Sequence, residues 1–176
     1  MVDLLVHFDR ELGTAFAEGM ETAYCGILNS GLSHSQINVK TLKDYLGVKD
    51  SGRTITDTID AKTINSTAGV IWMPYDRDPH IVPWFERLRQ EGYPGVLVTI
   101  YDSHPSPYVT EATRHSDASF HQLDLPGLEA FLLQEFPPKQ PDVKFPDDPD
   151  FWRAWRAAVE VNPTLASALL AIASYR

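Results

Sequence analysis

Short apolar runs that alternate with helical patterns are the feature that most restricts how this chain can fold. Three such runs cover residues 3–8, 68–73 and 96–101, and a fourth, more polar segment at 119–123 also predicts a strand. The first three are mostly apolar along their whole length, which is typical of strands buried on both faces of a parallel sheet. The β-branched residues of the third run, bounded by Gly95 and Asp102, also favour a strand.

Helical patterns follow three of these runs. After the first, apolar residues recur at three- and four-residue spacing until Asn29–Gly31 supplies a stop. Pro83 and Pro126 stand where two further helices begin, at the first helical position, where the missing N–H of proline costs nothing. This order predicts an α/β domain with a flavodoxin-like, five-stranded parallel sheet and helices on both faces. The apolar stripe of the first helix comprises Leu12, Ala15, Phe16, Met20, Ala23, Tyr24, Ile27 and Leu28.

Residues 32–66 fit more than one secondary structure. Within them, Ile37–Val39 fits a short strand and residues 41–46 fit a turn of helix. The Thr-rich segment 53–64 fits a helix or a strand equally well, because β-branched residues lose side-chain freedom in helices.

The composition of the chain changes after residue 136. Residues 1–136 form the predicted α/β domain, 137–149 predict a linker rich in Pro and Asp, and 150–176 predict an extension of two short helices. Trp152 and Trp155 lie at helical spacing in this extension. Two short helices cannot hold themselves together in water, so these tryptophans either dock on the main domain or bind a protein partner.

The charge of the chain argues against several classes of partner. The chain has 24 Asp and Glu against 15 Lys and Arg, so its net charge is -9. It therefore lacks the basic surface that would attract nucleic acids or anionic membranes. No apolar run approaches the roughly 20 residues that cross a bilayer. Cys25 is the only cysteine, which excludes an internal disulfide framework and a cysteine metal cage. We expect a cytoplasmic protein without nucleic-acid or membrane partners.

Charged residues follow the predicted strands at their carboxyl ends, where open α/β sheets bind ligands. Asp9 and Arg10 follow the first strand, Asp76 the run at 68–73, and Asp102 and His104 the run at 96–101. The three carboxylates could together hold Mg²⁺ for phosphoryl chemistry. Alternatively, each aspartate simply caps a turn.

Other motifs of catalysis are missing from the sequence. No two histidines have the i, i+4 spacing of a helical zinc site, and the G-x-S-x-G, P-loop and G-x-G-x-x-G patterns are absent. Cys25 falls on the predicted buried side of the first helix without a basic neighbour, which indicates packing. Glu86 remains a candidate in the first turns of its helix, where it either faces a ligand or complements the helix dipole.

Four segments carry a resemblance to a known family: Val2–Phe8, Asp50–Ile55 with Ile59 and Ser66, Ala68–Met73, and Trp84–Leu88. In order and spacing they resemble the opening strand, the glycine-containing loop with the second helix, the third strand, and the Trp-and-Glu helix of TIR (Toll/interleukin-receptor) domains. The resemblance spans about residues 1–136.

The TIR resemblance implies a signalling or defence module of one of two kinds. One is a scaffold that self-associates through the loop at Gly52 and Arg53. The other is an enzyme that cleaves the nicotinamide–ribose bond of NAD⁺, with Glu86 as its essential carboxylate, Trp84 or Trp72 stacking on a base and substrate bound in the crevice at the strand ends. NAD⁺ would then be a substrate, and neither a resident cofactor nor a metal is needed.

Two other hypotheses stay open beside the TIR-like module. The chain could be a non-catalytic adaptor that recruits a partner through its loops and C-terminal helices. It could also be a Mg²⁺-dependent nucleotide-binding or phosphotransfer enzyme that uses Asp9, Asp76 and Asp102.

Overall fold

A computed structural model describes residues 1–48, 55–75, 81–102, 110, 113–139 and 147–167 of the chain. The chain divides into two compact units, Met1–Pro138 and Lys139–Arg176, which we call the α/β unit and the C-terminal unit. None of the described helices has the length and apolar character that crossing a membrane requires.

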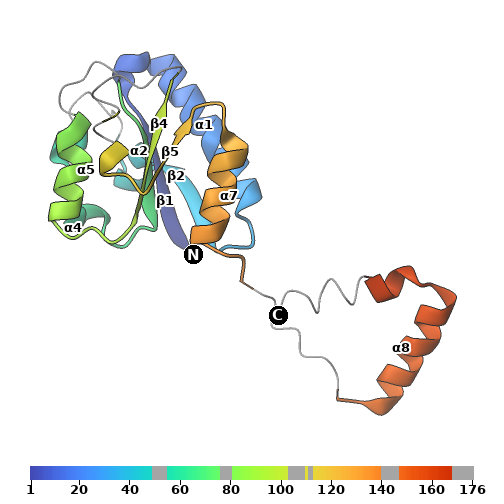
Figure 1. The fold of residues 1–176 in the computed structure, drawn as a ribbon. Coiled ribbons are helices and arrows are strands. Elements are labelled where there is room, and N and C mark those ends of the chain that lie inside the picture. The colour runs from blue at the N-terminus through green and yellow to red at the C-terminus, as the bar shows by residue number, and fades with distance from the viewer. Residues whose placement is uncertain (49–54, 76–80, 103–109, 111–112, 140–146, 168–176) are drawn as a thin grey trace. The chain divides into compact units, whose positions relative to one another are not determined.

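The α/β unit is built on one five-stranded sheet in which every paired strand is parallel (Figure 1). The spatial order is β2-β1-β3-β4-β5, so the predicted flavodoxin-like α/β fold is confirmed. The strands are β1 (Val2–Phe8), β2 (Ile37–Thr41), β3 (Gly69–Met73), β4 (Val96–Tyr101) and β5 (Ala118–His121).

Helices cover both faces of this sheet. Figure 1 places α1 and α7 over one face and α4 and α5 over the other. The ambiguous segment 32–66 contains β2 and three short helices in its described part, so its Thr-rich stretch forms two of these helices, at residues 55–58 and 61–64. The helices are η1 (Arg10–Leu12), α1 (Thr14–Gly31), α2 (Leu42–Leu46), α3 (Ile55–Thr58), α4 (Ala61–Ile64), α5 (Ile81–Gln90), α7 (Leu125–Glu135) and α8 (Pro149–Val161).

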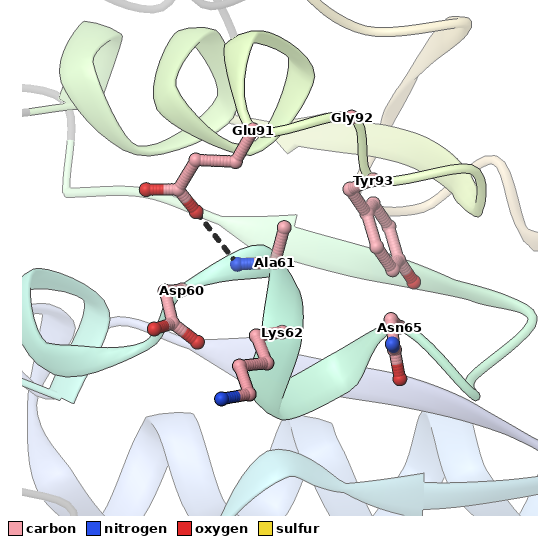
Figure 2. A pocket seen from close by; sticks show the side chains of 7 residues that line it. All are labelled: Asp60, Ala61, Lys62, Asn65, Glu91, Gly92 and Tyr93. Atoms are coloured by element: carbon pink, nitrogen blue, oxygen red, sulfur yellow. Dashed lines mark hydrogen bonds between the residues drawn. The ribbon is translucent and has the colours of Figure 1, made fainter.

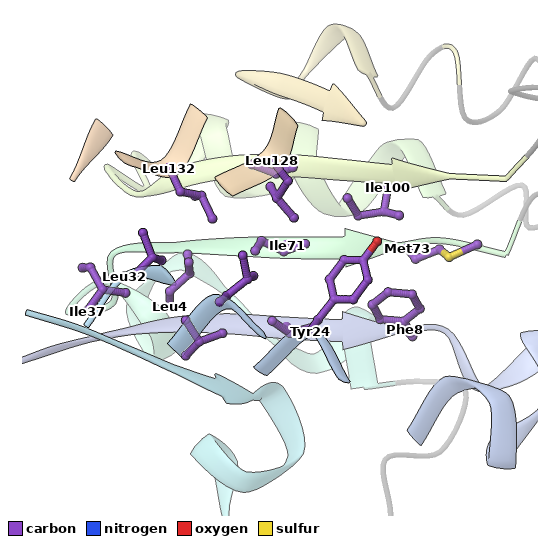
Figure 3. Packing of buried hydrophobic residues seen from close by; sticks show 14 of the residues in the cluster. Leu4, Phe8, Tyr24, Leu32, Ile37, Ile71, Met73, Ile100, Leu128 and Leu132 are labelled. Carbon is purple, nitrogen blue, oxygen red and sulfur yellow. The ribbon is translucent and has the colours of Figure 1, made fainter. Parts of the chain in front are cut away.

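Two apolar cores lie on the two sides of the sheet. Successive residues of a strand point to opposite faces, so Leu4 and Phe8 of β1 pack with α1 and α7 while Leu5 packs on the opposite side. Figure 3 shows the first core, where Tyr24 of α1 stands edge-on to the Phe8 ring at 5.0 Å and Leu128 enters from α7. Side chains on both faces are buried, which explains why β1, β3 and β4 have mostly apolar sequences.

The C-terminal unit contains α8, which begins after Asp148. The Asp148 side chain accepts a hydrogen bond from the Asp150 backbone N–H at 2.9 Å and so caps the helix. A helical turn at residues 164–167 begins where the second short helix is predicted. The remainder of that predicted helix lies outside the described residues.

Candidate functional site

The order of the strands creates a switch point at the carboxyl ends of β1 and β3. From β1 the chain proceeds to β2 on one side and later returns to β3 on the other, which is where open α/β sheets leave a crevice. β1 also extends beyond β2, because their pairing ends at Val6 and Thr41. The backbone of Phe8 therefore has no strand neighbour on that side.

Glu21 of α1 takes the place of the missing strand. Its Oε1 accepts a hydrogen bond from the Phe8 backbone N–H at 2.9 Å. Arg10, directly after β1, donates from Nη1 to Oε1 at 2.9 Å and from Nη2 to Oε2 at 3.0 Å. Glu21 is only 2% exposed, so this fork-to-fork pair is a charge-assisted contact largely shielded from water.

The surroundings of Glu21 keep it ionised despite its burial. Burial by itself raises the pKa of this carboxyl group. The interactions with His7, Arg10 and the Phe8 N–H, together with the charge of Arg10, outweigh burial and hold the pKa below its ordinary value of 4.5. A buried carboxylate at this position is therefore a fixed negative charge at neutral pH.

His7 connects this network to an aromatic cluster on the α5 side of the sheet. Its Nδ1 lies 3.5 Å from Glu21 Oε1, and its ring stands edge-on to Trp84 at 6.5 Å. In the β1–β3 register His7 is directly opposite Trp72, whose ring lies 4.8 Å from that of Trp84. Trp84 Nε1 donates to the Ile59 carbonyl at 3.2 Å. The predicted base-stacking residue Trp84 is thus enclosed in the core.

A cavity of about 220 Å³ opens beside Arg10, between α1 and the first turn of α2. Two cations and three carboxylates meet in its wall together with two threonines. Lys43 Nζ lies 3.5 Å from Glu18 Oε1 across it. The lining residues are Arg10, Glu18, Glu21, Thr22, Thr41, Lys43 and Asp44.

The two described aspartates of the predicted Mg²⁺ site serve local structure. Asp9 Oδ1 accepts from the Glu11 N–H at 2.9 Å and caps η1, and Asp102 Oδ1 accepts from Gln122 Nε2 at 3.2 Å. Because β3 separates β1 from β4, their strands are about 10 Å apart. Within the described ranges, no three His, Cys, Asp or Glu side chains gather as a metal site.

Four predicted site residues lie outside the described residues. These are Asp76 and His104 of the crevice, and Gly52 and Arg53 of the self-association loop.

Glu86 is placed on the outer side of α5. Its Oε1 accepts a hydrogen bond from Gln90 Nε2 at 3.0 Å, one turn further along the same helix. The helix buries Trp84, Phe85 and Leu88, and at 100° per residue Glu86 points about 150° away from the middle of that face. The structure therefore links Arg10 to Trp84 through Glu21 and His7, and leaves Glu86 apart from this chain of contacts.

A larger cavity, of about 420 Å³, lies at the opposite end of the strands from the switch point (Figure 2). Its residues precede β3 and β4, at the amino ends of these strands. Glu91 Oε2 accepts from the Ala61 N–H at 2.7 Å, which satisfies the first turn of α4. The cavity wall thus contains a helix cap, and it is remote in the fold from the switch point. Its lining comprises Asp60, Ala61, Lys62, Asn65, Glu91, Gly92 and Tyr93.

The Glu21 network was missed by the sequence analysis because the first helix was predicted in the wrong rotation. Phe16 and Ile27 of the predicted apolar stripe are exposed, at 43% and 44%. The buried stripe is Ala17, Glu21, Tyr24 and Leu28, so the prediction is confirmed for Tyr24 and Leu28 and missed Ala17 and Glu21. The available signal in the sequence was Glu21, four residues after Ala17 on a stripe that is otherwise apolar. Glu is almost never buried without a partner, so a glutamate on such a stripe indicates a buried ion pair or hydrogen bond.

Cys25 behaves as a packing residue, as its sequence context indicates. Burial raises the pKa of its thiol to about 12, and the nearby carboxylates of Glu21 and Asp44 act in the same direction. The thiol therefore stays protonated at neutral pH, which makes it a poor nucleophile.

The chain was compared with known proteins at the level of families, sequences and structures. No protein-family model matches it. No curated protein and no solved structure gives a significant match.

Proposed function

We propose that the α/β unit is a TIR-like signalling or defence module that binds NAD⁺ at the carboxyl edge of β1 and β3 and cleaves its nicotinamide–ribose bond. The observation that carries the proposal is the position of Arg10, a guanidinium fixed at the switch point by a buried carboxylate. Arginine suits the diphosphate of a dinucleotide because its planar donors match phosphate oxygens. The β2-β1-β3-β4-β5 order supports a ligand at this edge.

The reaction assigned to this site is a hydrolysis. Water attacks C1′ of the ribose, the C1′–N bond breaks, nicotinamide leaves with the electron pair of that bond, and one proton passes to solvent. The ribose gains positive charge in the transition state, which a carboxylate stabilises. The TIR resemblance gives this role to Glu86. Glu86 lies on the outer side of α5, where its Oε1 accepts from Gln90 Nε2, so this assignment rests on the resemblance alone.

Nicotinamide release from NAD⁺ tests the proposal. We expect the purified chain to release nicotinamide, measured by chromatography, and Glu86→Gln to lower the rate by about 100-fold or more, because it removes the stabilising charge. Glu135→Gln, an exposed substitution near the end of α7, is the matched control and keeps the wild-type rate. Absence of release at high protein concentration, or equal rates in the wild type and Glu86→Gln, would reject this hydrolase.

The aromatic face of α8 favours a second function, recruitment of a protein partner. Phe151 lies 5.3 Å from Trp152 and stacks on Trp155 at 6.4 Å. Trp152, Trp155 and Val159 have the i, i+3, i+7 spacing of a helix that binds in an apolar groove. Arg156 borders this face, so an apolar groove with an acidic rim is the complementary partner surface.

Removal of residues 139–176 distinguishes partner binding from docking of α8 on the α/β unit. If α8 serves a partner, the truncated chain retains the melting temperature of the α/β unit and its nicotinamide release. A lower melting temperature in thermal unfolding would instead show that the tryptophans stabilise the α/β unit, and it would contradict the recruiting function.

A further inference from the structure

We infer that Glu21 is the positioning residue of the proposed NAD⁺ site, because its buried carboxylate holds the Arg10 guanidinium in one orientation at the carboxyl end of β1. The inference rests on the proposed function and names a residue that neither the TIR resemblance nor any sequence motif assigns. Glu21 is a positioning residue rather than a catalytic one, since both of its oxygens are occupied by protein donors.

The geometry of the pair explains how it acts. Arg10 stands in η1, a single turn directly after β1, and its long side chain would otherwise sample many rotamers. Bonds from Nη1 and Nη2 to the two oxygens of Glu21 fix the plane of the guanidinium. A third contact, from Nη1 to the Phe8 carbonyl at 3.3 Å, adds to this restraint.

Glu21 is itself fixed, so it is a rigid anchor. Its helix packs on the sheet through Ala17, Tyr24 and Leu28, and the Phe8 N–H holds the carboxylate at the strand. Arg10 is therefore ordered before a ligand arrives, and the ligand does not lose affinity in ordering it. Without the charge of Glu21 the orientation must be established on binding, which weakens binding of the same anionic ligand.

A double-mutant cycle on the full chain tests this inference with NAD⁺ as the probe. Calorimetry gives the affinity of the wild type, Glu21→Gln, Arg10→Ala and the double variant. Glutamine keeps the length of the side chain and an acceptor for the Phe8 N–H but loses the charge. We expect Glu21→Gln to weaken binding about tenfold in the presence of Arg10 and to have no further effect in the Arg10→Ala background. Glu135→Gln serves as the control with unchanged affinity.

The outcomes separate positioning from a general structural role. Equal weakening by Glu21→Gln in both Arg10 backgrounds, or no weakening in either, overturns the inference. A structural role would act through the folded fraction, which circular dichroism measures on the same samples.

A measurement without NAD⁺ keeps this inference distinct from the proposed function. The Arg10 Nε–Hε signal in ¹⁵N NMR spectra reports the rigidity of the guanidinium. We expect one sharp, slowly exchanging signal in the wild type and an averaged signal in Glu21→Gln. If the wild type does not bind NAD⁺, the proposed function fails while this signature still supports positioning. If the wild-type signal is already averaged, the inference fails whether or not NAD⁺ binds, and this result does not depend on any variant folding.

Discussion

We expect Glu21→Ala to lower the free energy of unfolding by about 3–5 kcal/mol, because it removes the carboxylate of a buried ion pair. The change removes both bonds between Arg10 and Glu21 and leaves the Phe8 N–H without an acceptor. Urea unfolding followed by tryptophan fluorescence measures the loss. Glu18→Ala, one turn earlier on α1, removes only the exposed contact with Lys43 and should cost less than about 1 kcal/mol.

The difference in the free energy of unfolding between the wild type and Glu21→Ala depends on pH. The pKa of Glu21 in the folded chain lies below its ordinary value of 4.5, so the unfolded chain binds the proton more readily. The stabilisation from Glu21 is therefore fully present above about pH 5 and is lost as the pH falls through the folded pKa. The gap in stability between the wild type and Glu21→Ala should narrow across that range. A gap that is constant from pH 7 to pH 3 would contradict the ionised, hydrogen-bonded state of Glu21.

Trp72→Ala is expected to cost about 3–5 kcal/mol through the cavity that it leaves in the second core. Trp72 is 1% exposed and its ring contacts Trp84 at 4.8 Å and Phe85 at 5.0 Å. The neighbouring rings come from α5 and cannot close the gap without moving the helix. Leu123→Ala, at a side chain that is 76% exposed, is the control and should change stability by less than about 0.5 kcal/mol in the same urea experiment.

Replacing each of the two tryptophans with phenylalanine refines this prediction. Trp84 Nε1 donates to the Ile59 carbonyl, whereas Trp72 Nε1 is buried with no hydrogen-bond partner in the described part of the chain. Trp84→Phe therefore loses volume and a hydrogen bond, and Trp72→Phe loses volume only. We expect Trp84→Phe to be the more costly by about 1 kcal/mol. The reverse order would show that a donor on Trp72 matters more than its packing.

The elements of the fold that the sequence predicts well are those whose signals are local. β4 is observed at the predicted residues 96–101, because Gly95 and Asp102 bound an apolar run on both sides. β5 ends two residues earlier than predicted. The reason is local but polar: the Leu123 N–H donates to His121 Nδ1 at 3.1 Å, which turns the chain and exposes Leu123.

The part of the candidate site that sequence reasoning could not assemble depends on contacts between distant elements. Asp9 and Arg10 were found because strand ends are recognisable. Glu21 was not, because its burial is stabilised by Arg10 and by the backbone of Phe8, which are 11 and 13 residues away in the chain. Glu86 was chosen for its place in the chain, and the helical rotation that faces it away from the core follows only from which side of α5 packs on the sheet.

The early end of β2 has a mechanical consequence. The last bond on that side of β1 is supplied by a helix instead of a strand, since Glu21 occupies the position next to Phe8. α1 and the tip of β1 are therefore tethered, and a sliding movement of the helix must either break the tether or carry Arg10 along. A molecule that bound the outer surface of α1 and shifted this helix would therefore also shift Arg10, without entering the crevice at the switch point.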